Sequence, residues 1–540
     1  MPKTKFIIVT GGVLSGLGKG VACASIGNLL FSKYKVIPVK CDGYLNVDPG
    51  TMNPIEHGEV FVLEDGGEVD MDFGHYERFL GVSCKFNWNL TMGKVFDVIR
   101  KKERKGDFLG KTVQFIPHVT GLIKEWWFSI AKEEKADILL IEIGGTVGDL
   151  ENELYIEAAR QLKRDVGIKN VMYAHLTYVP VPYGVHEQKS KPTQQSVNLL
   201  REKGIVPNII IGRCSEILSD KIKEKIAIFC DVKKEAVITG LDVDNVYKIP
   251  IIFEKEGVSK ILKNCLHIKV EPNLKKWSLL VKNMGYAKKT VRIAICGKYT
   301  TLEDSYASII EALNHCGAHL KCGVKAVFVE TTDMKNIRNI KSHLKDIDGV
   351  IVPGGFGGRG VEGKIEIIKY CRKNNIPFLG ICYGMQLAIV EFARNVCGLK
   401  NANTTEINPK TKHPVIDILP EQKKISEMGG TMRLGTYPAI LKKDSKIFKL
   451  YGAISVSERH RHRYEVNPDY IAQLEKKGVV FSGMSPDRKL CEFMELPSHP
   501  YFVGCQGHPE LKSGFLKPAP LFYGLVKTSL ERKKTGFSEI

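Results

Sequence analysis

The sequence has no apolar run long enough to cross a membrane as a helix. Such a span needs roughly 20 consecutive apolar residues, and the apolar runs of this 540-residue chain are much shorter. The opening residues, MPKTKFIIVT, also lack a small-residue cleavage site after their apolar run. We therefore expect a first β-strand here rather than a signal peptide, and no membrane partner.

Paired cysteines and RNA-binding motifs are absent too. The 14 cysteines are scattered without a C-x-x-C pair, which argues against a zinc ribbon and against a secreted disulfide scaffold. Basic and aromatic residues are not interleaved as in RNA-binding motifs, and there is no tandem repeat. A protein of the reduced cytoplasm fits this composition best.

Acidic residues are too few to balance the basic ones. The chain has 79 Lys and Arg against 60 Asp and Glu, a formal net charge of +19. Nucleic acid, an anionic membrane or highly phosphorylated small substrates would each complement this charge. Much of the excess is diffuse, as in RKKERK at residues 100–105. A basic nucleic-acid-binding or filament-forming protein therefore stays open as a non-enzymatic alternative.

What the sequence does have is an α/β pattern in two stretches. Short β-branched runs are followed by glycine and then by helical patterns, which predicts mainly parallel sheets flanked by helices. The runs are FIIVT, KVIPVK, DILLIEIGG, VMYAHLTYV and NIIIG, then VRIAICGKY, GVIVPGG, PFLGIC and YFVGCQ. A polar stretch without strand runs separates them. We expect two α/β domains, residues 1–270 and 291–540, joined by a linker at 271–290.

A glycine-rich loop, VTGGVLSGLGKG, follows the first predicted strand. Val13 stands where the Walker pattern G-x-x-x-x-G-K-[ST] needs glycine, and Gly20 stands where it needs a hydroxyl. Backbone N–H groups, Lys19 and the start of a helix near Gly20 can nevertheless converge on a phosphate. A tight turn without a ligand is the alternative, and the loop alone does not decide between the two.

Acidic and basic residues follow at expected strand ends and loops. Asp70 and Asp72 lie two apart, so both would point to one side of an extended segment. Glu142 ends a buried strand, since five of the six residues before it are apolar. Such carboxylates are the ligands that Mg²⁺ prefers, although acidic residues also decorate loops. The loop EQKSKPTQQS, which its proline should keep extended, could hold a second polyphosphate or be a solvated surface loop.

The strings GGVLSGLGKG, NVDPGTM, HGEVFVLEDG, DFGHYERF, IEIGGTVGDLE and KSKPTQ together resemble the synthetase domain of the CTP synthase family. The resemblance runs nearly continuously from residue 6 to about 270. In this dethiobiotin-synthetase-like branch of P-loop enzymes, a loop without the Walker hydroxyl is the normal form. Gly43 departs from the family, which usually has proline there, and implies a looser loop after Lys40.

The resemblance implies specific roles in this domain. The residues implied in ATP binding are Gly16, Leu17, Gly18, Lys19, Gly20, Val21 and Asp72. Those implied in UTP or CTP binding are Ser15, Asp149, Leu150, Glu151, Lys189, Ser190, Lys191, Pro192, Thr193, Gln194 and Lys225. Asp72 and Glu142 would hold Mg²⁺, and Lys40 would lie near the transferred phosphate.

The second stretch contains a cysteine nucleophile motif. In PFLGICYGMQLA an apolar strand leads to G-x-C-x-G around Cys382, the cysteine form of the nucleophile elbow, at a helix start that favours the thiolate. A buried structural cysteine, the alternative, fits most of the other cysteines better. In CQGHPE, His508 can act as base and Glu510 can orient it, both on one side of an extended segment. The N–H groups of Gly354 and Gly355 could bind an oxyanion.

This half resembles class I glutamine amidotransferases, and ERHRHRYEVN with GGTMRLG again resembles CTP synthase. The resemblance implies that Cys382 attacks the glutamine amide, His508 shuttles protons and Glu510 orients His508. The residues implied at the oxyanion and glutamine sites are Gly355, Tyr383, Gln386, Glu406 and Arg463. Tyr383 stands where the family commonly has leucine, and Gly507 replaces a larger, often aromatic residue, so glutamine affinity and glutaminase rate could differ here.

Together the halves imply ATP-dependent amination of UTP at C4, through a 4-phosphorylated intermediate, as the last step of de novo CTP synthesis. Ammonia from glutamine would pass His57 and Val60, GTP would activate near PGGFGGRG, and CTP would inhibit. The family assembles as a homotetramer, and the sequence leaves filaments open. Cobyrinate amidases combine the same two domain types and remain an alternative, although the KSKPTQ and DLE segments favour a nucleotide acceptor. Polyphosphate substrates account for the basic charge without nucleic acid.

Overall fold

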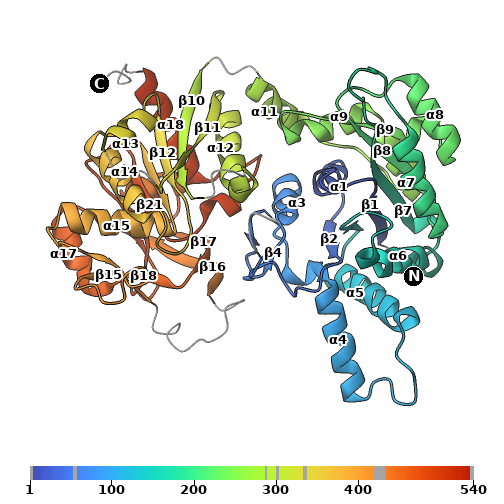
Figure 1. Ribbon diagram of the computed structural model, residues 1–540, viewed down its shortest axis with the longest axis horizontal. Helices are drawn as coiled ribbons and strands as arrows, with labels where there is room; N and C mark the ends of the chain where they lie inside the picture. The colour runs from blue at the N-terminus through green and yellow to red at the C-terminus, as the bar shows by residue number, and fades with distance from the viewer. Residues whose placement is uncertain are drawn as a thin grey trace. The chain divides into compact units, whose positions relative to one another are not determined.

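The computed structural model describes residues 4–52, 58–285, 289–298, 303–332, 337–418 and 432–534. The chain divides into two compact units, each drawn in Figure 1. Unit 1 comprises Met1–Pro49 and His75–Ser278, and unit 2 comprises Gly50–Gly74 and Leu279–Ile540. The later boundary falls inside helix α11 (Lys275–Gly285), within the predicted linker. Sequence reasoning did not anticipate that residues 50–74 group with unit 2. Among the described helices, none combines the length and apolarity needed to cross a membrane.

The core of unit 1 is a seven-stranded sheet of order β5-β2-β6-β1-β7-β8-β9, in which every neighbouring pair is parallel. Its strands are β1 (Lys5–Gly11), β2 (Val36–Asp42), β5 (Asn89–Thr91), β6 (Ile138–Ile143), β7 (Val171–Tyr178), β8 (Ile209–Cys214) and β9 (Val237–Leu241). Five of them are the predicted runs of the first half. The central strands are buried almost throughout, which explains their continuous apolar sequences.

Helices flank this sheet. They are α1 (Lys19–Asn28), α3 (Asp72–Leu80), α4 (Met92–Lys105), α5 (Thr120–Glu133), α6 (Glu153–Val166), α7 (Lys191–Glu202), α8 (Asp220–Cys230), α9 (Ile249–Lys255) and α10 (Val258–Leu266). The sequence sets the bounds of α4, because the Thr91 side chain accepts from the N–H of Lys94 and Gly106 ends the helix with a φ of 91°. Figure 1 shows α4 extending beyond the sheet of its unit.

Unit 2 is built on a nine-stranded sheet of order β11-β10-β12-β13-β21-β20-β19-β16-β17. The first five strands are mutually parallel and the rest are antiparallel. They are β10 (Thr290–Gly297), β11 (Gly323–Glu330), β12 (Gly349–Val352), β13 (Phe378–Ile381), β16 (Arg433–Leu441), β17 (Ser455–His462), β19 (Val480–Met484), β20 (Cys491–Glu495) and β21 (Phe502–Cys505). The four runs predicted in the second half are confirmed as β10, β12, β13 and β21.

Smaller elements complete unit 2. A three-stranded sheet contains β14 (Asn403–Thr404), β15 (Pro414–Ile418) and β18 (Tyr464–Val466), and a hairpin contains β3 (Phe61–Val62) and β4 (Glu68–Val69). The helices are α12 (Ala307–Leu320), α13 (Ile337–His343), α14 (Val361–Lys373), α15 (Tyr383–Asn395), α16 (Lys446–Tyr451), α17 (Ile471–Lys476) and α18 (Pro520–Lys534). Both units are therefore α/β, with helices around a sheet that is parallel throughout in unit 1 and parallel over the first five strands in unit 2.

Arginines of β17 hold residues 50–74 in unit 2. Arg459 donates from Nη1 to the carbonyl oxygen of Val62 at 3.0 Å, and Arg461 pairs through Nε with Oε1 of Glu68 at 2.7 Å. Both arginines belong to the string ERHRHRYEVN, so this family-like segment has a structural role in anchoring the β3–β4 hairpin.

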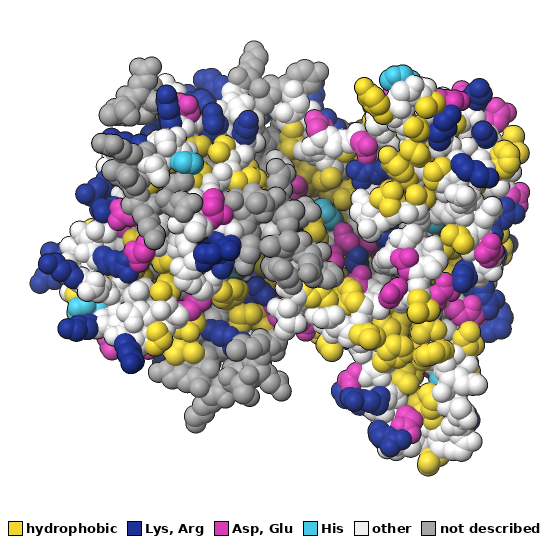
Figure 2. Space-filling view, in the orientation of Figure 1, with side chains coloured by type: hydrophobic (Ala, Val, Ile, Leu, Met, Phe, Trp, Pro, Cys, Tyr) yellow, Lys and Arg dark blue, Asp and Glu magenta, His cyan; other side chains and the backbone are white. Residues whose placement is uncertain are grey.

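On the face drawn in Figure 2, the charged side chains of the described residues do not gather into one basic patch. Figure 2 shows Lys and Arg dispersed over the visible face and mixed with Asp and Glu.

Candidate active sites

The glycine-rich loop of unit 1 connects β1 to α1 through left-handed backbone positions. Gly16 and Gly18 have φ of 75° and 83°, which glycine adopts at little cost. Val13, at the position of the absent Walker glycine, also has a left-handed φ of 78°. A β-branched residue is strained there, at a cost of order 1–3 kcal/mol. Lys19 begins α1 and donates from Nζ to the carbonyl oxygen of Gly145 at 2.8 Å. The loop therefore has the backbone form of a phosphate-binding loop.

A buried ionic cluster lies where β2 and β6 end. Nζ of Lys40 lies 3.3 Å from Oε1 of Glu142 and 3.5 Å from Oδ1 of Asp42, and all three residues are buried. Lys40 and Glu142 are direct partners in the parallel register of the two strands. The phenol of Tyr76 donates to the other oxygen of Glu142. Carboxylates and a lysine at this position suit a transferred phosphoryl group and the hard oxygen ligation of Mg²⁺.

The second predicted magnesium ligand, Asp72, lies on the first turn of α3, which the unit boundary after Gly74 separates from the rest of that helix. Asp72 is the first residue of α3, and its N–H donates to Oδ1 of Asp70 at 2.8 Å. The expected extended geometry is therefore wrong, because Asp70 accepts a hydrogen bond at the start of a helix instead of pointing beside Asp72. Among the described residues, no three His, Cys, Asp or Glu side chains gather as a metal site. The pairing of Asp72 with Glu142 remains a prediction.

The residues predicted to bind UTP or CTP lie on three loop segments, around Ser15, Leu150 and Lys189, and on helices α7 and α8 of unit 1. Asp149 accepts from the N–H of Thr146 at 2.7 Å. Leu150 is 84% exposed and Glu151 is exposed. Ser15 is exposed on the glycine-rich loop. These exposed side chains lie in loops that follow the carboxyl ends of the strands. Ligands bind at this edge of open parallel sheets.

The KSKPTQ segment is not the extended loop that its proline suggested. Helix α7 begins at Lys191, with Pro192 in its first turn, where proline needs no hydrogen-bonded N–H. Gln194 donates from Nε2 to Oγ of Ser190 at 3.0 Å, and Thr193 is buried behind them. The segment therefore offers the start of a helix to an anion.

Three lysines lie near one carboxylate beside this helix. Lys189 pairs with Glu187 at 2.6 Å. The hydrogen bond from Lys189, with the charges of Lys221 and Lys225, lowers the pKa of Glu187. The structure thus brings Lys225, predicted from the resemblance, into the same electrostatic field as Lys189.

Sequence reasoning missed an apolar pocket beside the glycine-rich loop. Its volume is about 80 Å³, and Leu17, Ile211, Val246 and Phe253 contribute to its walls. Arg213 also lines it, donating from Nη1 to the carbonyl oxygen of Leu17 at 3.0 Å and pairing with Asp242 at 2.6 Å. Apolar walls with one guanidinium suit a flat aromatic base.

In unit 2, Cys382 lies at a strained turn between β13 and α15. Its φ of 49° and ψ of −104° are unusual for a residue with a side chain. Its N–H donates to the carbonyl oxygen of Cys505 at 2.7 Å. A Cβ at Gly384 would lie 1.9 Å from the carbonyl oxygen of Val352, so only glycine fits there. The predicted nucleophile elbow is confirmed as a local structure.

His508 and Glu510 contact each other as predicted, but the backbone that carries them is not extended. Nδ1 of His508 lies 2.7 Å from Oε1 of Glu510. Residues Pro509–Lys512 form a 3₁₀ turn, so the expected extended segment is wrong, because proline is also accommodated at the start of a helical turn. Burial lowers the pKa of His508, but the charges of Glu510 and Cys382 outweigh it and raise the value to about 10. This geometry favours an imidazolium at His508.

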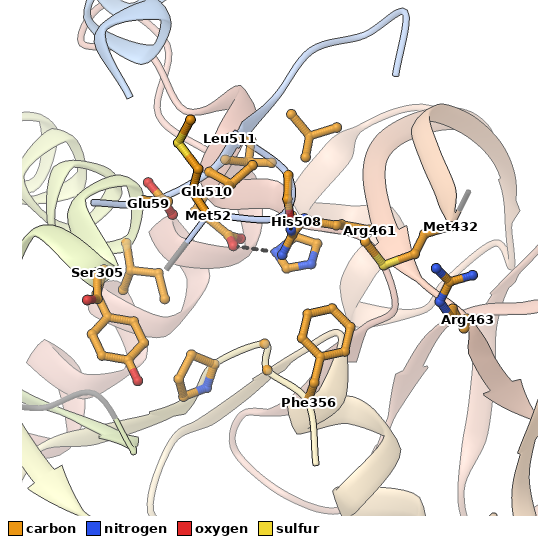
Figure 3. A pocket seen from close by; sticks show the side chains of 18 residues that line it. Met52, Glu59, Ser305, Phe356, Met432, Arg461, Arg463, His508, Glu510 and Leu511 are labelled. Atoms are coloured by element: carbon orange, nitrogen blue, oxygen red, sulfur yellow. Dashed lines mark hydrogen bonds and ion pairs between the residues drawn. The ribbon is translucent and has the colours of Figure 1, made fainter. Parts of the chain in front are cut away.

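A pocket of about 400 Å³ opens beside this pair. Its lining includes the predicted residues Val60, Gly354, Gly355, Arg463, His508 and Glu510. Figure 3 shows His508 and Glu510 joined by their hydrogen bond, with Phe356 and Arg463 at other points of the wall. His57, predicted with Val60, lies outside the described residues.

The remaining predicted glutamine-site residues surround the elbow. The phenol of Tyr383 donates to the carbonyl oxygen of Gly357 at 2.9 Å, and the N–H of Gly357 donates to Oε1 of Glu406 at 2.6 Å. Burial raises the pKa of Glu406. Gln386 is buried behind the nucleophile and donates from Nε2 to the carbonyl oxygen of Tyr464 at 2.8 Å. The fold therefore brings the predicted set together from five separate segments.

Comparison with known proteins gives two family models and many curated relatives that match this chain. The family model "CTP synthase N-terminus" matches residues 5–268, and "Glutamine amidotransferase class-I" matches residues 301–528. A CTP synthase of Borreliella afzelii is 56% identical over 97% of this chain and 99% of its own length. The chain belongs to the CTP synthase family. A CTP synthase of Archaeoglobus fulgidus is 51% identical over 98% of this chain and 99% of its own.

A solved structure is similar to part of this chain. The glutaminase domain of Trypanosoma brucei CTPS with bound acivicin is 35% identical, covers 45% of this chain and 94% of that structure, and has a TM-score of 0.42.

Two glycines that were predicted to depart from the CTP synthase family are closely packed. A Cβ at Gly43 would lie 2.7 Å from Cβ of Glu151, so glycine lets the loop after β2 approach the loop that carries Glu151. A Cβ at Gly507 would lie 2.8 Å from Cβ of Glu458 and 3.0 Å from the carbonyl oxygen of Arg459. In this member of the CTP synthase family, β17 therefore packs directly against the backbone before His508.

Four side chains at these CTP synthase sites escaped sequence reasoning, namely Asp42, Tyr76, Arg213 and Gln506. Asp42 lies two residues after Lys40 in a predicted strand, so period-two alternation could have placed both on one side. Tyr76 and Gln506 stand in the quoted strings DFGHYERF and CQGHPE, but they and Arg213 contact groups that are distant in sequence, so spacing did not single them out.

Proposed function

We propose that this CTP synthase family member converts UTP to CTP, using ATP and ammonia released from glutamine. The observation that supports this most directly is the pair of chemically different sites. Unit 1 has the glycine-rich loop and the buried Lys40–Glu142 cluster. Unit 2 has a strained Cys382 and a hydrogen-bonded His508–Glu510 pair. We assign the synthetase reaction to residues 1–270 and the glutaminase reaction to residues 291–540, joined at 271–290.

In the glutaminase reaction, the thiolate of Cys382 attacks the side-chain amide of glutamine. The N–H of Gly355 stabilises the oxyanion, and the His508 imidazolium protonates the departing ammonia. Water then hydrolyses the thioester while His508 accepts its proton. Glu510 holds the imidazole through Nδ1, which leaves Nε2 for these transfers. Tyr383, Gln386, Glu406 and Arg463 hold the glutamine.

In the synthetase reaction, the γ-phosphoryl group of ATP moves to O4 of UTP, and ammonia then displaces phosphate at C4. Residues Gly16 to Val21 hold the ATP phosphates, Arg213 faces the adenine, and Lys40 stabilises the charge on the transferred group. Asp72 and Glu142 are the proposed ligands of Mg²⁺, which would neutralise phosphate charge when bound. The proposed UTP and CTP contacts are Ser15, Asp149, Leu150, Glu151, Lys189, Ser190, Lys191, Pro192, Thr193, Gln194 and Lys225.

We infer regulation and assembly from the family resemblance and from exposed apolar side chains. GTP activation near the PGGFGGRG loop and feedback inhibition by CTP follow from the family resemblance. Assembly as a homotetramer is supported by Leu109, Phe115 and Ile116, which are 86%, 63% and 52% exposed after α4. We place the protein in the cytoplasm, because all 14 cysteines are free thiols. Ammonia would pass His57 and Val60 on its way to the synthetase site.

The test is CTP formation from UTP, ATP and Mg²⁺, with glutamine and separately with an ammonium salt. The expected result is that Cys382→Ala loses glutamine-dependent synthesis and keeps ammonia-dependent synthesis. If the parent protein hydrolyses glutamine but makes no CTP from either nitrogen source, the acceptor is another molecule, such as a cobyrinate.

A further inference from the structure

The sulfur of Cys382 has two polar neighbours outside the catalytic set proposed above. The carbonyl oxygen of Arg461 lies 3.9 Å from Sγ, and Nε2 of Gln506 lies 3.7 Å from it. A thiol can donate to a carbonyl, whereas a thiolate can only accept. The backbone contact therefore serves the thiol, and the amide contact serves the thiolate that attacks.

The direction of the Gln506 amide is fixed from behind. The Nε2 group of Gln386 lies 2.8 Å from the carbonyl oxygen of Tyr464 and 3.3 Å from Oε1 of Gln506. A backbone carbonyl can only accept, so the NH₂ of Gln386 faces this side and donates to both oxygens. Oε1 of Gln506 is thereby engaged as an acceptor, and its NH₂ must face Cys382. Gln506 is fully buried, so no solvent competes with this arrangement.

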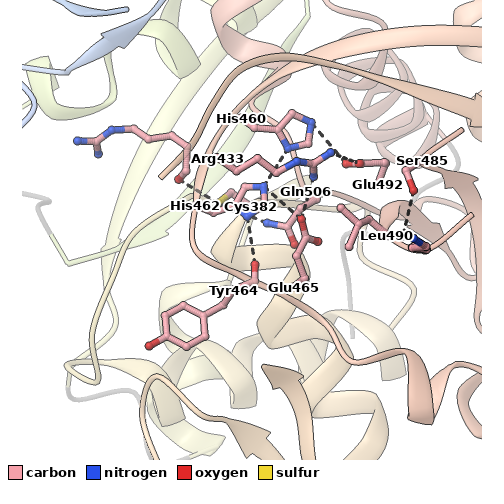
Figure 4. Close-up of polar contacts among 12 residues, drawn as sticks. Cys382, Arg433, His460, His462, Tyr464, Glu465, Ser485, Leu490, Glu492 and Gln506 are labelled. Atoms are coloured by element: carbon pink, nitrogen blue, oxygen red, sulfur yellow. Dashed lines mark hydrogen bonds and ion pairs between the residues drawn. The ribbon is translucent and has the colours of Figure 1, made fainter. Parts of the chain in front are cut away.

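A buried histidine pair holds the same carbonyl of Tyr464 (Figure 4). Nδ1 of His462 lies 3.1 Å from this oxygen and must carry a hydrogen. Nε2 of His462 then accepts from Nδ1 of His460 at 2.9 Å. Nε2 of His460 lies 3.4 Å from Oε2 of Glu492, an ion-pair contact at the far end of the histidine pair.

The charges around the histidine pair keep both imidazoles neutral. Burial lowers the pKa of His460 and of His462 well below the ordinary value, and it raises the pKa of Glu492 and of Glu465. Arg433 pairs with Glu465 at 2.8 Å and with Glu492 at 2.6 Å, and one guanidinium balances only one carboxylate. Two neutral imidazoles with one proton on this pair of carboxylates satisfy the charge balance, and the neutral His462 donates from Nδ1 to the Tyr464 carbonyl.

We propose that Gln506 is a further catalytic residue of the glutaminase site, whose side-chain amide stabilises the Cys382 thiolate by donating a hydrogen bond to Sγ. Gln386, His462, His460 and Glu492 are positioning residues, which fix the direction of that amide through the Tyr464 carbonyl. The inference rests on the proposed role of Cys382 as nucleophile.

The test compares alkylation of Cys382 by iodoacetamide in the parent and in Gln506→Met, which removes the donor at similar volume. Peptide mass spectrometry follows the rate at Cys382 over a series of pH values. Loss of one hydrogen bond to an ionised group predicts alkylation about tenfold slower at neutral pH. The difference in alkylation rate between the parent and the variant should become smaller in alkaline buffer, where the Cys382 thiol ionises without the hydrogen bond from Gln506. Glutaminase kcat should fall about as much, with KM for glutamine little changed.

The matched control removes another contact between a buried glutamine amide and a cysteine sulfur, in unit 1. Gln188 is also buried, and its Nε2 lies 3.7 Å from Sγ of Cys214 in unit 1. Gln188→Met should leave the alkylation rate of Cys382 unchanged. If Gln506→Met does not fold, Gln506→Glu keeps the shape and adds a carboxylate that cannot donate to the thiolate, so it should slow alkylation further.

The positioning role has its own pair of variants. His462→Asn keeps an N–H near the Tyr464 carbonyl, whereas His462→Leu removes it, so the leucine variant should alkylate more slowly. Equal alkylation profiles for the parent and the Gln506 variants would overturn the proposal, as would a rise in KM without a change in kcat. If the parent makes no CTP from any nitrogen source, the proposed function fails, yet the alkylation comparison still decides the role of Gln506.

Discussion

Replacing Gly507 with alanine should disturb the glutaminase site through a single methyl group. The added Cβ would lie 2.8 Å from Cβ of Glu458, 3.0 Å from the carbonyl oxygen of Arg459 and 3.3 Å from Nε2 of His460. Carbon atoms in contact prefer about 3.5–4.0 Å, so strand β17 or the segment after β21 must move by about 1 Å. The N–H of His508 donates to the carbonyl oxygen of Arg459 at 2.7 Å, so this movement reaches the catalytic base.

The expected magnitude has two parts. Overpacking of this kind costs about 1–3 kcal/mol, which corresponds to a fall in Tm of about 2–5 °C for a unit of this size. A displacement of about 1 Å at a catalytic group can cost about 100-fold in rate. We therefore expect glutamine-dependent CTP synthesis to fall about 10- to 100-fold, while ammonia-dependent synthesis is retained.

The assay is CTP formation with each nitrogen source, together with thermal unfolding. Gly514→Ala is the matched control, since its Cβ would have only the carbonyl oxygen of Lys517 within 4 Å, at 3.7 Å. The packing argument is refuted if Gly507→Ala matches Gly514→Ala in both Tm and glutamine-dependent rate.

Three further predictions follow from the charged groups. The pKa of His508, raised from 6.5 to about 10, means that its protonation stabilises the fold below pH 6.5 and that this stability is lost as the pH rises towards 10; thermal unfolding across pH should therefore show Glu510→Gln least stable, relative to the parent, at low pH. Arg433→Met leaves two buried carboxylates without their cation and should cost about 3–5 kcal/mol in chemical denaturation. Arg213→Met should raise KM for ATP in ammonia-dependent synthesis about tenfold, with the glutaminase rate unchanged.

The sequence by itself determined the α/β class and the strands that carry the chemistry. Strands buried on both faces must be apolar and β-branched along their length, so runs such as DILLIEIGG and PFLGIC are legible without a structure. The elbow at Cys382 could be predicted because its motif contains glycines, and only glycine fits where two backbone segments approach so closely. Edge and antiparallel strands such as β9, β16 and β20 were not found. Their sequences carry charges or glycine, and partners far along the chain stabilise them.

Tertiary structure alone decided which distant groups meet. Residues 50–74 join unit 2 because Arg459 and Arg461 bind their backbone and carboxylates, and no local pattern specifies a contact across about 400 positions. Proline was ambiguous, since it suits both an extended segment and the first turn of a helix, and packing chose the turn in KSKPTQ and HPE. The amide of Gln506 acquires a direction only through the hydrogen-bond chain behind it. The spacing of residues along the chain predicts the reacting groups. The direction of a hydrogen bond and the burial of a side chain are properties of the folded core.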